Sequence, residues 1–86
     1  MGELIDSLKD DIENLKQVRD ELRVQLHIGK ADIKDRWHKL EDKWIDVDGR
    51  AKQIGSESFH VIAEATQRLV DELKRDYDEL KRALKD

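Results

Sequence analysis

The stretch that decides the fold is "ELRVQLHIGKADIKDRW", residues 21–37, because it places Gly29 where a long helix would ordinarily carry Leu or Ala. A glycine there either ends the helix, bends it, or lies inside it where two backbones come close. Steps of three, four and four residues select Leu15, Val18, Leu22, Leu26, Gly29, Ile33, Trp37, Leu40, Trp44, Asp48 and Ala51. This eleven-residue period, about 3.67 residues per turn, predicts one nearly straight helix that continues through Gly29.

The clearest break in the apolar pattern is "IGSES", residues 54–58. Gly55 can adopt the left-handed conformation that ends a helix, and Ser56 or Ser58 can cap the next one. Before the break the apolar face begins at Ile5, and after it the pattern continues through Phe59, Ile62, Thr66, Leu69, Leu73, Tyr77, Leu80 and Leu84. The sequence therefore predicts an all-α long helical hairpin: a helix over about 3–53, which passes Gly49, a turn at 54–57, and a helix over about 58–85.

Such a hairpin leaves the apolar face of residues 5–26 uncovered, and each large apolar side chain is worth about 1.5 to 3 kcal/mol when buried. Two arrangements cover it. In the first, the helix stays straight and residues 5–26 pack on a second subunit, which gives an antiparallel homodimer with a three-helix bundle at each end. In the second, the chain bends at Gly29, with Asp32 capping the next helix, and forms a monomeric three-helix bundle. The preserved period favours the homodimer.

The homodimer assigns a role to each apolar position near Gly29. The expected interface comprises Leu8, Ile12, Leu15, Val18, Leu22, Val24, Leu26, Ile28, Gly29 and Ile33. The expected core aromatic residues are Trp37, Trp44, Phe59 and Tyr77. Arg19 lies beside this apolar interface. It can form a buried ion pair, or it can run its stem over apolar surface and keep its charge in water. The second interpretation is favoured because arginine stems commonly cover apolar surface in this way.

Composition indicates one helical domain over residues 1–86. Charged residues make up 44% of the 86 residues and aromatic ones 5%, with no proline and no cysteine, which is typical of long exposed helices. The 17 basic and 21 acidic residues are interleaved, so no basic block predicts nucleic-acid binding. No apolar run approaches the ~20 residues of a membrane span, and the N-terminus lacks a signal-peptide pattern. We expect a soluble, unprocessed, cytoplasmic protein.

The sequence predicts no enzyme and no cofactor, because it has no cysteine nucleophile and no glycine-rich turn for a phosphate. Asp35 with His38 and Glu57 with His60 each place a carboxylate and a histidine three residues apart, as di-iron helical proteins do. Solvated histidines are the preferred interpretation, with a metal site as the alternative. Trp37 and Trp44 could mark a lipid surface, although a bundle core explains them better.

The segment "DELRVQLHIGKADIKDRWHKLEDKW", residues 20–44, resembles the central segment of small, uncharacterised bacterial coiled-coil proteins. The resemblance is carried by Leu22, Val24, Leu26, Lys30, Asp35 and Trp37. It implies a bacterial source and brings no activity. Together with the helical pattern, it leads us to expect a structural or protein-interaction role with a second copy of the chain as partner, or, as an alternative, reversible binding to a membrane surface.

Overall fold

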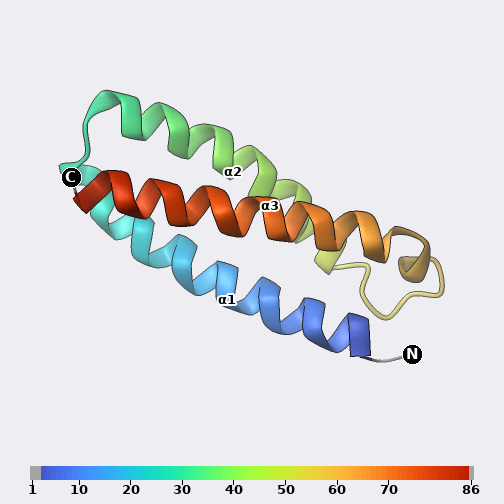
Figure 1. The fold of residues 1–86 in the computed structure, drawn as a ribbon. Helices are drawn as coiled ribbons and strands as arrows, with labels where there is room; N and C mark the ends of the chain where they lie inside the picture. Colours follow the sequence, from blue (N-terminus) through green and yellow to red (C-terminus); the bar gives the residue numbers. More distant parts are fainter. Residues whose placement is uncertain (1–2, 86) are drawn as a thin grey trace.

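The protein forms a three-helix bundle. The computed structural model describes residues 3–85, which contain helix α1 (Glu3–Gln25), a short 3-10 turn η1 (Leu26–Ile28), helix α2 (Ala31–Ala51) and helix α3 (Phe59–Lys85). The chain runs up α1, back along α2 and up α3, so α1 and α3 are parallel and α2 is antiparallel to both (Figure 1). The bundle is a rod of 43 × 19 × 17 Å, and over the described residues it is entirely helical and without strands.

The expected continuous helix over residues 3–53 is wrong in this structure, because α1 ends at Gln25 and α2 begins at Ala31. We call residues 26–30 the junction. The Gly29 N–H donates to the Leu26 carbonyl oxygen at 2.9 Å, which closes the 3-10 turn. Folding back at the junction places the apolar face of α1 against α2 and α3 of the same chain. This is the bent arrangement that the sequence offered as its alternative.

The junction also differs in detail from that alternative. Gly29 is extended, with φ −82° and ψ 155°, and does not adopt the left-handed conformation of a helix-ending glycine. The residue that precedes α2 is Lys30, with φ −71° and ψ 165°, while Asp32 lies inside the first turn. The Lys30 carbonyl oxygen accepts bonds from the N–H groups of Ile33 and Lys34 at 3.0 and 3.1 Å. No side chain caps the start of α2.

The second connection follows the sequence prediction closely. Helix α2 passes Gly49 without a break and ends at Ala51. Gly55 has φ +102°, the left-handed conformation predicted for it, and no other described residue has positive φ. The Phe59 N–H donates to the Ser56 carbonyl oxygen at 3.2 Å at the start of α3.

The core runs the length of the rod and follows the helical period. The buried apolar residues are Leu8, Leu15 and Leu22 from α1; Trp37, Leu40, Trp44 and Val47 from α2; and Phe59, Ala63, Val70, Leu73, Tyr77 and Leu80 from α3. The rings of Trp37 and Tyr77 stack with centroids 6.1 Å apart, within the range of favourable aromatic pairs. Thr66 is buried too, and its hydroxyl donates to the Ile62 carbonyl oxygen at 2.7 Å.

Candidate interaction site

The residues expected at a dimer interface lie mostly inside the bundle of one chain. Leu8, Leu15 and Leu22 are fully buried, and Ile12, Val18, Leu26 and Ile33 are partly buried against the same core. Gly29 lies in the junction. Val24 is 68% exposed and contributes nothing to this core, while the side chain of Ile28 lies outside the described part of the chain. Trp37, Trp44, Phe59 and Tyr77 are all buried.

Helices α2 and α3 form a groove that holds α1, and we call this groove the α1 seat. Leu8, Leu15 and Leu22 are seven residues apart, so they project from one side of α1 into the seat. Polar contacts fix both edges. On the α2 edge Arg19 binds Glu41, and on the α3 edge the Asp11 carboxylate accepts from Gln67 Nε2 at 3.2 Å. The seat is therefore an apolar groove with polar rims that holds the amphipathic α1 of the same chain.

The Arg19–Glu41 ion pair is the most specific contact between α1 and α2. Arg19 Nε and Nη2 donate to the two carboxylate oxygens of Glu41 at 2.7 and 2.8 Å. The guanidinium also lies over the Trp44 ring, 5.5 Å from its centroid. The hydrogen bonds to Glu41 raise the pKa of Arg19, against an opposing effect of burial. Because the side chain is only 18% exposed, the expectation that its charge stays in water is wrong.

Glu41 was not singled out from the sequence, although the position of the bend predicts its pairing with Arg19. If α1 and α2 fold back symmetrically about residue 30, residue 19 lies opposite residue 41. Only the choice of a bend over a straight helix makes that pairing visible within one chain.

Tyr77 places a polar group in the middle of the core. Its side chain is 1% exposed, and its hydroxyl has no hydrogen-bond partner among residues 3–85. Burial raises the pKa of the Tyr77 phenol far above its ordinary value, and the negative charge of Glu41 adds to the rise. Tyr77 therefore keeps its proton at physiological pH.

The contact between α2 and α3 carries its own ion pairs. Lys43 Nζ donates to Asp76 Oδ2 at 2.6 Å and to Glu72 Oε1 at 3.0 Å. These hydrogen bonds, that to Asp76 first, raise the pKa of Lys43. The pairs are partly exposed, so they fix the register of the two helices more than they stabilise them.

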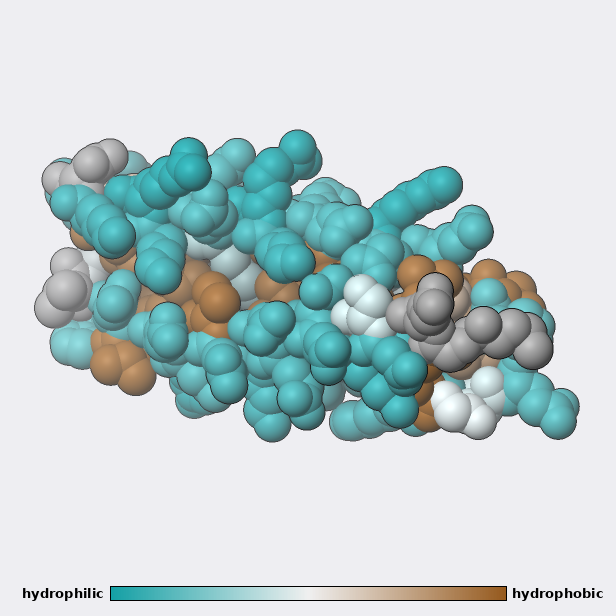
Figure 2. Space-filling view, turned by 60° about the horizontal axis from the view of Figure 1, so that its bottom comes forward, coloured by the Kyte–Doolittle hydropathy of each residue, from teal (hydrophilic) through white to brown (hydrophobic). Residues whose placement is uncertain are grey.

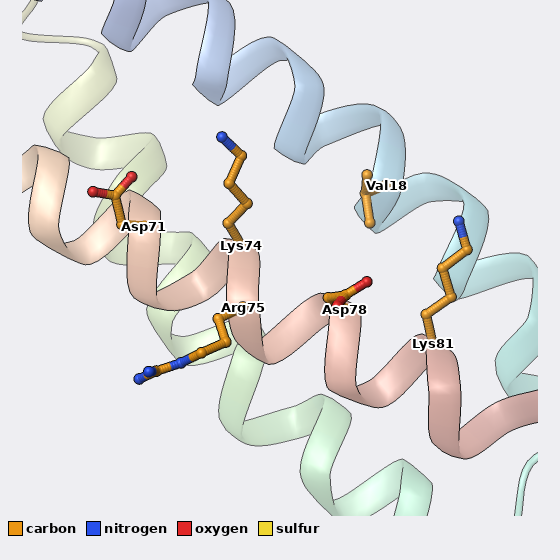
Figure 3. A pocket seen from close by; sticks show the side chains of 6 residues that line it. All are labelled: Val18, Asp71, Lys74, Arg75, Asp78 and Lys81. Atoms are coloured by element: carbon orange, nitrogen blue, oxygen red, sulfur yellow. The ribbon is translucent and has the colours of Figure 1, made fainter.

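A groove of about 470 Å³ runs along the outside of the α1–α3 contact. Figure 3 shows Val18 facing it from α1, with Lys74 and Lys81 extending from α3 toward α1 and Arg75 pointing away. The α3 wall carries both signs of charge, with Asp71 before Lys74 and Arg75, and Asp78 between Arg75 and Lys81. An open groove with one apolar residue and balanced charges lacks the convergent polar groups of a small-molecule site. It is a seam between helices.

The remaining surface is dominated by charge. The face in Figure 2 is covered by hydrophilic side chains, with apolar residues visible along a narrow central seam and near the ends. Leu4, Val24, Ile45 and Val61 are the exposed large apolar residues of the described chain. His38 and His60 are exposed, and residues 3–85 contain no group of three potential metal ligands. None of the described helices is both long and apolar enough to cross a membrane.

Fold and site together define a small, highly charged three-helix bundle in which a hairpin of two helices holds a third. The chain matches no protein-family model, no curated protein and no solved structure at a significant level.

Proposed function

We propose that the protein is a non-enzymatic interaction module whose α1 seat binds an amphipathic helix, and that it acts as a homodimer in which a second copy supplies this helix. The observation that supports the proposal is the seating of α1 itself. Leu8, Leu15 and Leu22 are fully buried against a hairpin to which α1 is joined only by the short junction. A second copy carries the same helix with the same three residues.

The charged edges of the seat give this binding its specificity. An incoming α1 must place a base opposite Glu41 and a carboxylate opposite Gln67, as Arg19 and Asp11 do. An unrelated amphipathic helix would leave these partly buried groups unpaired, which costs binding free energy. The chain's own α1 is the helix that satisfies them.

Light scattering after size exclusion tests the homodimer across chain concentrations from micromolar to millimolar. We expect a species of twice the 10.1 kDa chain mass whose fraction rises with concentration. Val24→Ser and Ile45→Ser serve as controls, because both residues are exposed in the bundle. A dimer that these changes abolish would be a surface contact, and a species that stays near 10 kDa throughout would contradict the homodimer.

A further inference from the structure

We propose that the junction is a hinge. When residues 26–30 become helical, α1 leaves its own seat and fills that of a second copy, so that two chains exchange their α1 helices. This inference rests on the proposed homodimer and states how it forms. The partner is a second copy of this chain, and the exchanged segment is α1. The dimer then uses the contacts that α1 already makes in the bundle.

The first support is the phase of the buried residues. At about 100° per residue, the buried positions Leu8, Leu15, Leu22, Trp37, Leu40, Trp44 and Val47 fall within an arc of about 80° on one uninterrupted helix. The buried positions of α3 are centred about 70° from the centre of that arc when the same count is carried across the second turn. Two helices joined by a turn can bury residues at unrelated angles around the helix axis. A continuous helix over α1 and α2 requires a common phase.

The second support is the contrast between the two connections. The turn before α3 contains Gly55 at φ +102°, a conformation that other residues adopt only under strain. The junction has no such signal, since Gly29 and Lys30 have φ −82° and −71°, and no side chain caps α2. Residues with ordinary backbone angles can become helical without strain. The sequence therefore fixes one turn firmly and leaves the other free to straighten.

The third support is the packing around Gly29. A Cβ atom built there would lie 3.2 Å from the Leu26 carbonyl oxygen, 3.3 Å from Ile33 Cγ2 and 3.4 Å from Leu84 Cδ2. In the bent form an alanine here would require its neighbours to move by a few tenths of an ångström, whereas a helix prefers alanine to glycine. The junction also borders a hollow of about 470 Å³ whose lining includes Gly29, Ile33 and Leu84, so it is not packed all round.

These features make two substitutions act in opposite directions. Gly29→Ala crowds the bent form and favours the helix at both junctions of an exchanged dimer. We expect about a thirty-fold lower dimer dissociation constant, which combines roughly one glycine-to-alanine helix preference per chain. Gly49→Ala is the matched control, because Gly49 lies inside α2 in both forms with no atom within 4 Å of an added Cβ.

Lys30→Pro locks the bent form. Proline requires φ near −65°, and Lys30 has −71°, while Gly29 at ψ 155° has the extended conformation that suits a residue before proline. The bundle should keep its fold, but a helix through residue 30 would lose a hydrogen bond and clash. We expect the dimer to disappear, and Lys30→Ala, which removes the side chain beyond Cβ but keeps the backbone N–H, to retain it.

Light scattering of the full chain and these four variants, from 10 µM to 1 mM, decides the proposal, with circular dichroism to verify folding. Exchange is supported if Gly29→Ala dimerises more tightly than Gly49→Ala and Lys30→Pro stays monomeric while Lys30→Ala does not. A wild-type dimer that persists in Lys30→Pro overturns the helical hinge and leaves the homodimer standing. Monomers throughout, Gly29→Ala included, overturn both.

Discussion

At the scale of single residues, Tyr77 is the polar group that the core satisfies least. Its hydroxyl is buried without a hydrogen-bond partner among the described residues, and an unsatisfied buried hydroxyl costs about 1 to 3 kcal/mol. Tyr77→Phe keeps the ring and its stacking on Trp37. We expect it to raise the free energy of unfolding by about 1 kcal/mol at neutral pH, measured by urea denaturation. A loss of stability would show that the hydroxyl is bonded in solution.

Tyr77 also predicts how stability depends on alkaline pH. Its pKa is raised in the folded chain, so ionisation costs the fold nothing at pH below the unfolded pKa of about 10 and destabilises it as the pH rises further. Lys43, whose pKa is also raised, acts with the same sign. We expect stability to fall above pH ~10. Because the chain has one tyrosine, phenolate absorbance reports on this residue alone and should rise together with unfolding.

In Tyr77→Phe the alkaline fall should become shallower, leaving the contribution of Lys43. An unchanged slope would show that the tyrosine is ionised as easily in the folded chain as in the unfolded one.

A double-mutant cycle measures the coupling free energy between Arg19 and Glu41. The bidentate geometry and partial burial of the pair predict a coupling free energy of about 1 to 2 kcal/mol, more than exposed ion pairs give. Arg19→Met and Glu41→Gln, alone and together, should show it in urea unfolding. The exposed Asp78–Arg82 pair, 3.2 Å apart within α3, is the comparison and should give under about 0.5 kcal/mol. Equal couplings would mean that the α1–α2 pair is solvated.

At the scale of helices and turns, alanine substitutions at two glycines in the second half of the chain should change stability in opposite directions. Gly55→Ala places a side chain at φ +102°, which should cost about 1 to 2 kcal/mol. Gly49→Ala fills open space inside α2 and should stabilise by about 0.5 to 1 kcal/mol. Thermal unfolding followed by circular dichroism measures both. A stabilising Gly55→Ala would indicate that the turn differs in solution.

The same glycines explain how far sequence analysis could go. Gly55 was predictable because its role is local: a glycine between two helical patterns can adopt the left-handed conformation of a turn, and neighbouring serines follow. The role of Gly29 depends on Leu84, which is distant in sequence and reaches it only once α3 is in place. The period through residues 15–51 favours a straight helix, yet the chain bends between Gln25 and Ala31, so the period predicted which residues are buried without predicting which helix covers them.

The candidate site was predictable to a similar degree. Leu8, Leu15 and Leu22 follow from periodicity alone, as do the buried aromatic residues. The polar rims do not, because Arg19 with Glu41 and Asp11 with Gln67 are pairs between helices whose alignment depends on the bend. Val24 was predicted at a dimer interface, and in the bundle of one chain it is exposed. It is apolar and close to the stripe, yet the helical turn points it to solvent.

At the scale of the whole molecule, we expect a core of this size to unfold cooperatively, as one unit. Domains of this length have free energies of unfolding of about 5 to 15 kcal/mol, and truncating one fully buried leucine costs about 2 to 5. Leu15→Ala should therefore remove a large share of the stability, while Val24→Ala at an exposed site should change it little. Tryptophan fluorescence and circular dichroism during urea unfolding should give coincident transitions for the wild type. Separate transitions would mean that α1 detaches before the hairpin unfolds.

The parallel run of α1 and α3 has a mechanical consequence. The start of α1 and the end of α3 lie at opposite ends of the 43 Å rod (Figure 1). Tension applied between these two points pulls the helices lengthwise past each other. The apolar contacts along the helices then resist the force together instead of separating one after another. The Arg19–Glu41 and Asp11–Gln67 contacts cross the sliding surfaces on either side of α1. The bundle should yield under force in one step, with α1 as the element that slips.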